Sequence, residues 1–173
     1  MADFEIKDGV AIISEETTEI DEFAFENCEE LKSINIPVNV ITIGAWAFSG
    51  CNKLETISIH STIDTIKNNT FNGCTSLEQI LIPKSVKLIE QGAFSGCTSL
   101  KEVVIPENVE KIEAEAFFEC KNLETIIFEG ETTLDEDCFT CCPRLTTISI
   151  CPNTAKHYKE CLGEHWHYYI VEE

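Results

Sequence analysis

The sequence is poor in positive charge. It contains 12 Lys and Arg residues against 31 Asp and Glu residues, which gives a formal net charge of −19 at pH 7. Because a surface this acidic repels phosphate groups, the composition argues against binding to nucleic acid or to anionic membranes. It permits basic protein partners and cations, although charge of this size also keeps a protein soluble.

Long apolar runs are missing as well. No stretch approaches the roughly 18 consecutive apolar residues of a membrane span, so no membrane insertion is predicted. The first residues carry neither the basic start nor the apolar segment of a signal peptide. As written, the chain is therefore expected in the cytoplasm, unless an export signal preceded Met1.

The familiar signatures of enzymes are also absent. The sequence contains no phosphate-binding loop, no Gly-x-Ser-x-Gly elbow and no metalloprotease motif. These absences favour a non-enzymatic protein without a cofactor.

The chain is instead built from one pattern, Phe-x-x-Cys-x-x-Leu-x-x-Ile-x-Ile, which occurs six times with conservative replacements. The copies follow one another every 23 residues, and the last copy follows after 22. The pattern begins at Phe25, Phe48, Phe71, Phe94, Phe117 and Phe139. A period of about 20–29 residues is typical of a solenoid, in which each coil stacks on the one before.

Each position of the repeat predicts a local structure. In Leu-x-x-Ile-x-Ile the alternating apolar residues, such as Val103 and Ile105, indicate a strand with one buried face. Each strand can pair only with its copy in the next coil, so the sheet is predicted to be parallel. The Ala-Phe-x-Gly-Cys segment is expected to close the coil in a tight, short helical turn, with the phenylalanines stacked as a continuous spine.

The most complete copy, residues 93–112, reads Ala-Phe-x-Gly-Cys-x-x-Leu-x-x-Ile-x-Ile-Pro-x-x-Val-x-x-Ile. This pattern resembles the BspA-type leucine-rich repeat of bacterial surface antigens over about residues 20–150. The resemblance implies a β-rich, right-handed leucine-rich repeat solenoid of the α/β horseshoe-like class, with a parallel sheet on one face. It also implies a non-enzymatic protein-binding scaffold, as in cell-surface adhesion or host interaction, and a secreted or surface location if an export signal was removed.

The length predicts a single domain over residues 1–173, with an N-terminal cap (1–19), repeats (20–150) and a C-terminal cap (151–173). Two short strands, 4–6 and 10–13, are expected to form a hairpin through Asp8-Gly9. In the C-terminal cap, a helix over 155–162 and a closing strand over 166–171 are predicted.

The ten cysteines are expected to be free rather than paired. Six of them share one repeat position, where neighbouring side chains point the same way and have poor geometry for a disulfide. We expect these thiols and Cys138 to lie in the core; the six are Cys28, Cys51, Cys74, Cys97, Cys120 and Cys142. An alternative function, as a metal- or thiol-dependent protein, would use Cys141, Cys151, Cys161, His157 and His165. Around His157, Cys161 and His165 the Cys-x-x-Cys pairs of a structural zinc site are missing. The Cys-x-x-Cys formed by Cys138 and Cys141 has its first cysteine assigned to the core, so no metal ligands are assigned.

The outward positions of the main strands suggest a binding surface. Three successive copies carry Leu81, Val104 and Ile127 where water-facing residues are expected. On adjacent strands these side chains would form one apolar strip, which often marks an interaction site. The polar residues of the predicted site are Ser58, Gln79, Glu102 and Thr125. Two alternatives remain open: β-branched residues suit strands in any case, or the tail folds over the strip. The predicted partner is a protein, and the chain itself is expected to be a monomer or a weak homo-oligomer.

Overall fold

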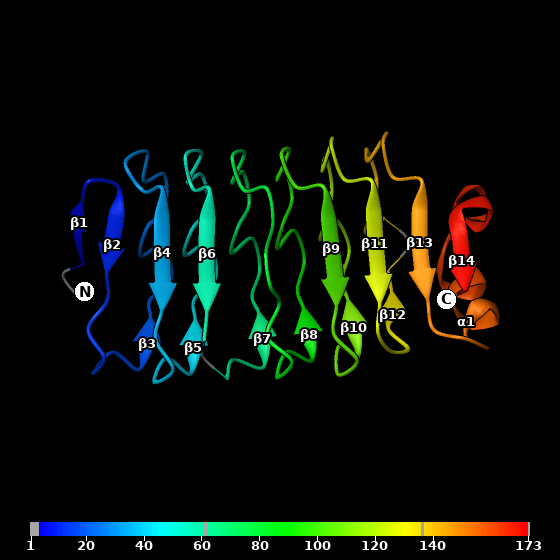
Figure 1. The fold of residues 1–173 in the computed structure, drawn as a ribbon, viewed down its shortest axis with the longest axis horizontal. Coiled ribbons are helices and arrows are strands. Elements are labelled where there is room, and N and C mark those ends of the chain that lie inside the picture. The colour runs from blue at the N-terminus through cyan, green and yellow to red at the C-terminus, as the bar shows by residue number, and fades with distance from the viewer. Residues whose placement is uncertain (1–3, 61, 136, 173) are drawn as a thin grey trace.

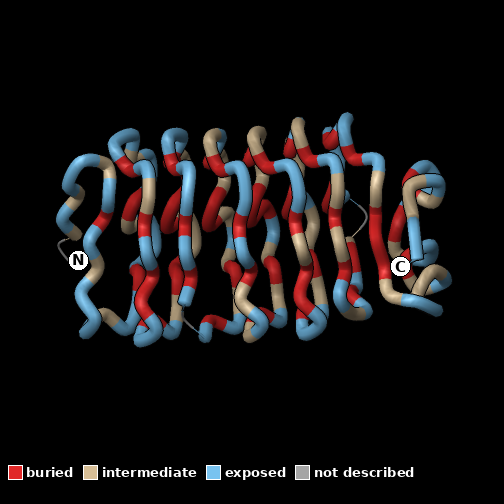
Figure 2. The backbone as a smooth tube through the Cα atoms, viewed as in Figure 1, coloured by how far each residue is buried: buried red, intermediate tan, exposed pale blue. Residues whose placement is uncertain are grey.

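The computed structural model describes residues 4–60, 62–135 and 137–172, so the first three residues and residue 173 of the predicted caps lie outside it. The described chain forms a row of stacked coils that runs from the N-terminus at one end to the C-terminus at the other (Figure 1). The apolar residues of the repeat turn inward in every coil and make one continuous core along the row (Figure 2). The predicted leucine-rich repeat solenoid is therefore confirmed.

The main strands occupy one side of the coils. They are β4 (Ser33–Ile36), β6 (Thr56–Ile59), β9 (Glu102–Ile105), β11 (Thr125–Phe128) and β13 (Thr147–Ile150). Copies pair in parallel and in the register that the repeat predicts, so Val103 lies opposite Ile126. Because side chains alternate along a strand, these residues are buried while their neighbours face outward.

A second, narrower row of parallel strands lies where each coil turns back. It comprises β3 (Glu19–Ile20), β5 (Thr42–Ile43), β7 (Thr65–Ile66), β8 (Leu88–Ile89), β10 (Lys111–Ile112) and β12 (Thr133–Leu134). Each of these strands buries its second residue in the core, for example Ile89 and Ile112. The solenoid thus has parallel pairing along two lines.

The Ala-Phe-x-Gly-Cys segments form hydrogen-bonded turns and not helices. In the second copy the backbone N–H of Cys51 donates to the oxygen of Phe48 at 3.1 Å, which closes the turn. Gly50 then takes a positive φ of 73°, a conformation that stops a right-handed helix after one turn. The same turns are tied to the next coil, since the N–H of Phe48 donates to the oxygen of Thr70 at 2.9 Å.

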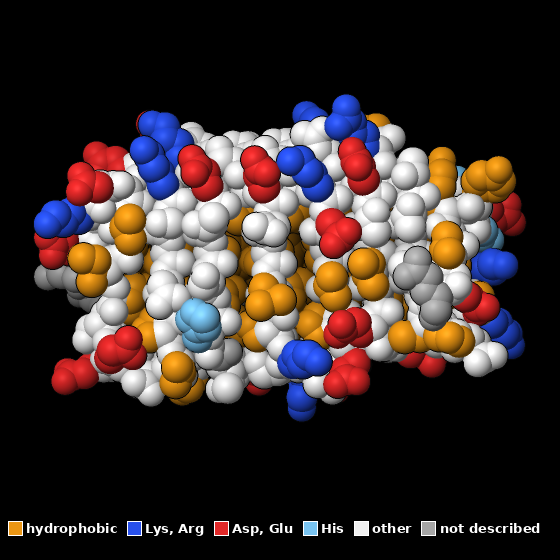
Figure 3. Space-filling view, viewed as in Figure 1, with side chains coloured by type: hydrophobic (Ala, Val, Ile, Leu, Met, Phe, Trp, Pro, Cys, Tyr) orange, Lys and Arg blue, Asp and Glu red, His pale blue; other side chains and the backbone are white. Residues whose placement is uncertain are grey.

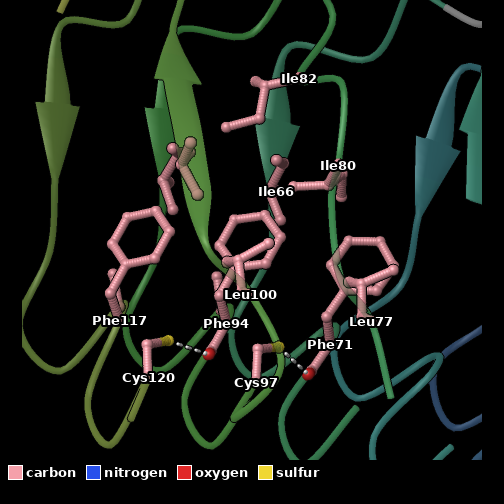
Figure 4. Close-up of a cluster of buried hydrophobic side chains, with 14 of the residues drawn as sticks. Ile66, Phe71, Leu77, Ile80, Ile82, Phe94, Cys97, Leu100, Phe117 and Cys120 are labelled. Atoms are coloured by element: carbon pink, nitrogen blue, oxygen red, sulfur yellow. Dashed lines mark hydrogen bonds between the residues drawn. The ribbon is translucent and has the colours of Figure 1, made fainter. Parts of the chain in front are cut away.

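The phenylalanines form the predicted spine (Figure 4). Successive ring centroids between Phe25 and Phe117 are 5.2–5.4 Å apart, with planes within 10° of parallel. The stack continues beyond the repeat at both ends. Phe4 covers Phe25 at 4.7 Å, and Trp166 meets Phe139 edge-on at 6.2 Å.

The N-terminal hairpin consists of β1 (Glu5–Lys7) and β2 (Val10–Ile12), which pair antiparallel. Asp8 and Gly9 both have positive φ, 53° and 85°, as the Asp-Gly pair requires in a type I′ turn. β2 pairs in parallel with β4, and β1 lies on the other side of β2. β1 is therefore the outermost strand of the main sheet at this end.

The C-terminal cap contains α1 (Ala155–Cys161), the 3-10 helix η1 (Glu164–Tyr169) and β14 (Ile170–Glu172). The predicted strand from residue 166 is wrong over its first half, because Trp166 N–H donates to Gly163 O at 2.9 Å and starts a helical turn. This turn directs Trp166 into the core, where it is 8% exposed. From α1, Tyr158 completes the irregular fifth copy: its hydroxyl donates to Gly130 O at 2.7 Å and accepts from Thr132 N–H at 3.1 Å.

Candidate functional site

The three apolar residues of the predicted site all lie on the outer side of their coils. Leu81 is 78% exposed, whereas Val104 and Ile127 are half-buried and lie opposite each other on β9 and β11. The last strand of the tail, β14, does not lie over these three residues. It pairs with β13 and so extends the same sheet. Figure 3 shows hydrophobic side chains gathered at the middle of this face, with charged side chains along its upper and lower margins.

The sheet is interrupted at Leu81, which the repeat did not predict. Residues 79–82 were expected to form a strand, but in the described chain they pair with neither β6 nor β9. The wider separation of the strands here is visible in a backbone contact that recurs from coil to coil. The N–H of Lys101 lies 3.4 Å from Glu78 O, whereas the equivalent contact one coil later, Glu124 N–H to Lys101 O, is 2.8 Å. The prediction of one uninterrupted main sheet is therefore wrong at this coil.

The interruption opens a groove of about 650 Å³ between β6 and β9. Five of the seven predicted site residues line it: Ser58, Gln79, Leu81, Glu102 and Val104. Thr125 and Ile127 lie outside the groove, on β11. The structure thus gathers most of the predicted site into one hollow, which a flat sheet would not have provided.

One ion pair lies at the groove. The Lys101 ammonium lies 3.2 Å from a carboxylate oxygen of Glu78, and both side chains are more than 60% exposed. An ion pair this exposed contributes about 0–1 kcal/mol to folding. Both groups are therefore available to a partner at little cost.

The residues of the alternative metal or thiol function are brought together only in part. His157 Nε2 lies 3.7 Å from Cys161 Sγ, and Nδ1 lies 3.2 Å from a carboxylate oxygen of Glu131. The same Nε2 is 2.8 Å from Thr132 O, so each ring nitrogen already faces an oxygen atom of the protein. Over the described residues, no three His, Cys, Asp or Glu side chains are grouped as a metal ion requires.

The six cysteines that share one repeat position form a ladder beside the spine, and all of them except Cys28 are buried. Cys51, Cys74, Cys97 and Cys120 donate to the carbonyl oxygen of the phenylalanine 26 residues earlier, at 3.1–3.2 Å. Cys138 is fully buried as predicted, whereas Cys28 is only half-buried. No disulfide joins the described cysteines, all of which are free.

Burial also changes the acidity of these thiols. It raises the pKa of Cys97, and that of Cys51, to about 12, because the core cannot solvate a thiolate. At the end of the ladder, the side chains of Cys120 and Cys142 contact each other. This contact raises the pKa of Cys120 and lowers that of Cys142.

We predict that Cys141 reacts first with a thiol reagent, since it is exposed and the ladder thiols are buried and protonated. Cys141 has a φ of 62° at a position that is glycine in three other copies. Cys141→Gly should therefore remove the fastest labelling phase and preserve the fold, as measured by timed alkylation and mass spectrometry. Equally fast labelling of Cys97, or a disulfide between two ladder cysteines, would contradict the prediction.

The turns that precede Phe25 and Phe48 carry a pair of aromatic residues that the sequence analysis did not single out. Phe23 is 51% exposed and stacks loosely on Trp46, with ring centroids 6.4 Å apart and planes at 22°. Both residues have positive φ, 59° and 60°. The left-handed region costs an ordinary residue about 1–2 kcal/mol. The next coils place Asn69 and Gly92, which tolerate it, at this position. Comparing this position between copies would have revealed the pair from sequence.

Coils that stack on one another, pair in parallel and share one core define a repeat solenoid, and the Leu-x-x-Ile-x-Ile strands place it among leucine-rich repeat proteins. The family model for the BspA type leucine rich repeat region matches six copies over residues 9–118 and 71–166. The chain therefore belongs to this family, and the predicted resemblance is confirmed. Leucine-rich repeat proteins commonly bind other proteins.

Solved structures with the same fold come from several bacteria. A leucine-rich repeat protein from Bacteroides ovatus is 25% identical, with a TM-score of 0.66 over 99% of this chain and 51% of its own. The leucine-rich repeat protein of T. pallidum is 24% identical, with a TM-score of 0.74 over 99% of this chain and 94% of its own. The pneumococcal vaccine antigen PcpA is 22% identical, with a TM-score of 0.80 over 96% of this chain and 42% of its own.

The chain thus spans about half the length of the Bacteroides ovatus protein. No curated protein sequence matches the chain. Among the described residues, no helix is both long and apolar enough to cross a bilayer.

Proposed function

We propose that the protein is a non-enzymatic binding module whose main-sheet face holds an extended segment of a protein partner in the groove at Leu81. The interrupted sheet carries this proposal. Residues 79–82 are unpaired within the described chain, and of these Gln79 and Leu81 are exposed, so their backbone N–H and C=O groups are the ones that a partner could use. An extended peptide can use such groups as it would use the edge of a sheet.

Side chains around the groove supply the rest of the contact. Leu81 and Val104 offer apolar surface, whereas Gln79, Glu102 and Ser58 offer hydrogen-bonding groups. Apolar contacts surrounded by polar groups are the usual anatomy of a protein interface. Val104 and Ile127 continue the apolar surface onto the intact part of the sheet. A location at the cell surface belongs to this proposal, since the family is known from bacterial surface antigens.

We predict that Leu81→Ser weakens partner binding about 10-fold or more, because burying a leucine side chain contributes about 1.5–3 kcal/mol. Serine is the residue that Ser58 and Ser149 supply at the same position of other copies, so the fold should tolerate it. A photo-crosslinking residue at position 81 would first identify the partner. The affinity of that purified partner for both chains would then be measured by calorimetry.

Ile41→Ser provides the matched control. Ile41 is 66% exposed and lies directly before β5, outside the groove. The same chemical change there should leave the affinity unaltered. Equal affinity of wild type and Leu81→Ser, both correctly folded by circular dichroism, would disprove the groove as the binding site.

A further inference from the structure

We propose that Phe23 and Trp46 form a second binding site, which takes arginine side chains of a basic protein segment. The site is separate from the groove and does not depend on it. It lies on the turns that precede Phe25 and Phe48, whereas the groove lies between the main strands.

The two rings lie outside the core of the solenoid. Neither belongs to the buried core or to the half-buried residues packed against it. Their centroids are 6.4 Å apart, against 5.2–5.4 Å in the spine between Phe25 and Phe117, so they also stack less closely on each other. The Phe23 ring is exposed, the Trp46 ring is half-buried, and both stack loosely at a left-handed turn position that Asn69 and Gly92 fill without strain in other coils. Strained positions of this kind are concentrated at functional sites.

The charges around the pair decide which ligand suits it. Asp21 and Glu22 directly precede Phe23, Glu26 follows one turn later, and all three are exposed. Residues 15–30 contain eight carboxylates and no Lys or Arg. Among the ion pairs of the described chain, none involves these three carboxylates. Within the described residues these three carboxylates thus remain without a cationic partner and would attract one.

Aromatic faces attract cations through their quadrupole, and carboxylates attract them by charge. A guanidinium gains more than an ammonium here, because it is planar, stacks on a ring and is less strongly hydrated. A neutral sugar could stack on the same rings but would gain nothing from the carboxylates. The combination of rings and acid thus points to arginine.

The test uses a fluorescein-labelled peptide of alternating Arg and Gly residues, a matched Lys and Gly peptide, and fluorescence anisotropy at physiological salt. The wild type should bind the Arg peptide several-fold more tightly than the Lys peptide. The double variant Phe23→Asn/Trp46→Asn should bind the Arg peptide at least 10-fold more weakly. Both substitutions leave the net charge at −19, so a purely Coulombic interaction would not change.

Stability separates a binding role from a structural one. Asn is the residue that Asn69 supplies at this position one coil later. The double variant should therefore unfold at the same temperature as the wild type or at a higher one. Trp46→Phe should retain most of the binding, and Leu81→Ser should retain all of it.

Several results would overturn the proposal. The first is that the wild type does not bind the Arg peptide. The second is that the double variant binds it as tightly as the wild type does, which would mean that the peptide is attracted by the overall negative charge and not by the rings. Displacement of the peptide by a neutral hexasaccharide would assign the rings to a carbohydrate instead. If Trp46→Asn does not fold, Phe23→Asn alone decides, because the Phe23 ring is half exposed; unchanged binding by that variant would again reject the site.

Discussion

Phe94→Ala should lower the free energy of unfolding by about 3–5 kcal/mol, the usual range for deleting a buried phenylalanine. The Phe94 side chain is fully buried between Phe71 at 5.4 Å and Phe117 at 5.2 Å. Removing it breaks two ring contacts and opens a cavity between three coils. Since the stability of a solenoid is approximately a sum over coils and their interfaces, the loss falls on two interfaces at once. Urea unfolding followed by circular dichroism would measure it.

Phe4→Ala is the matched control at the end of the spine. Phe4 is half-buried and stacks on one ring of the spine only, that of Phe25. Its removal should cost about 1–2 kcal/mol, since less apolar area returns to water. From the repeat alone, Phe25 would be expected to matter little, because no earlier copy covers it. Phe4 corrects this expectation, so Phe25→Ala should be nearly as costly as Phe94→Ala. Equal losses for Phe4→Ala and Phe94→Ala would mean that the spine does not hold the coils together.

The spine and the cysteine ladder could be predicted because a repeat places every copy in the same surroundings. Once Phe71, Phe94 and Phe117 share a position, stacking the coils brings their rings into contact whatever the other residues do. The strands of the two parallel rows follow for the same reason.

Elements outside the repeat were less predictable. Residues 166–169 are aromatic and β-favouring, yet they form a 3-10 turn because Trp166 must cover the end of the spine at Phe139. Local preference is overruled there by the burial of one large side chain. The irregular fifth copy likewise depends on Tyr158, which comes from a helix 26 residues further along the chain.

The candidate site was also predictable only in part. Which residues face outward follows from strand alternation, so Leu81 and Val104 were found. The groove was not found, because residues 78–82 fill every position of the repeat as well as any other copy does. Whether neighbouring strands approach to hydrogen-bonding distance depends on how the coils stack, which is a property of the assembled solenoid. Phe23 and Trp46 were overlooked because an exposed position carries no hydrophobic pattern.

Raising the pH to 10 should destabilise the folded protein through four buried thiols, of which Cys51 and Cys97 together account for about 2–3 kcal/mol. Burial raises the pKa of each from its ordinary 9.0, to about 12 for Cys51 and Cys97, and also upward for Cys74 and Cys138. Above pH 9 the unfolded chain releases these protons while the folded chain retains them. The protonated thiols therefore make their full contribution to the free energy of unfolding below pH 9, and this contribution is lost as the pH rises toward 12. At pH 10 Cys51 and Cys97 each account for about 1 kcal/mol.

Typical domains are stable by about 5–15 kcal/mol, so reduced protein should unfold near pH 10 in urea concentrations that it withstands at pH 7. Lysine deprotonation and general repulsion also act at this pH, and Cys97→Ser separates them from the thiols. The serine hydroxyl can still donate to Phe71 O, as the thiol does at 3.2 Å, but it does not titrate. Between pH 7 and pH 10 the variant should lose about 1 kcal/mol less stability than the wild type. If both chains lose the same amount, the ladder thiols ionise freely in the folded state, and the core around them is open to water.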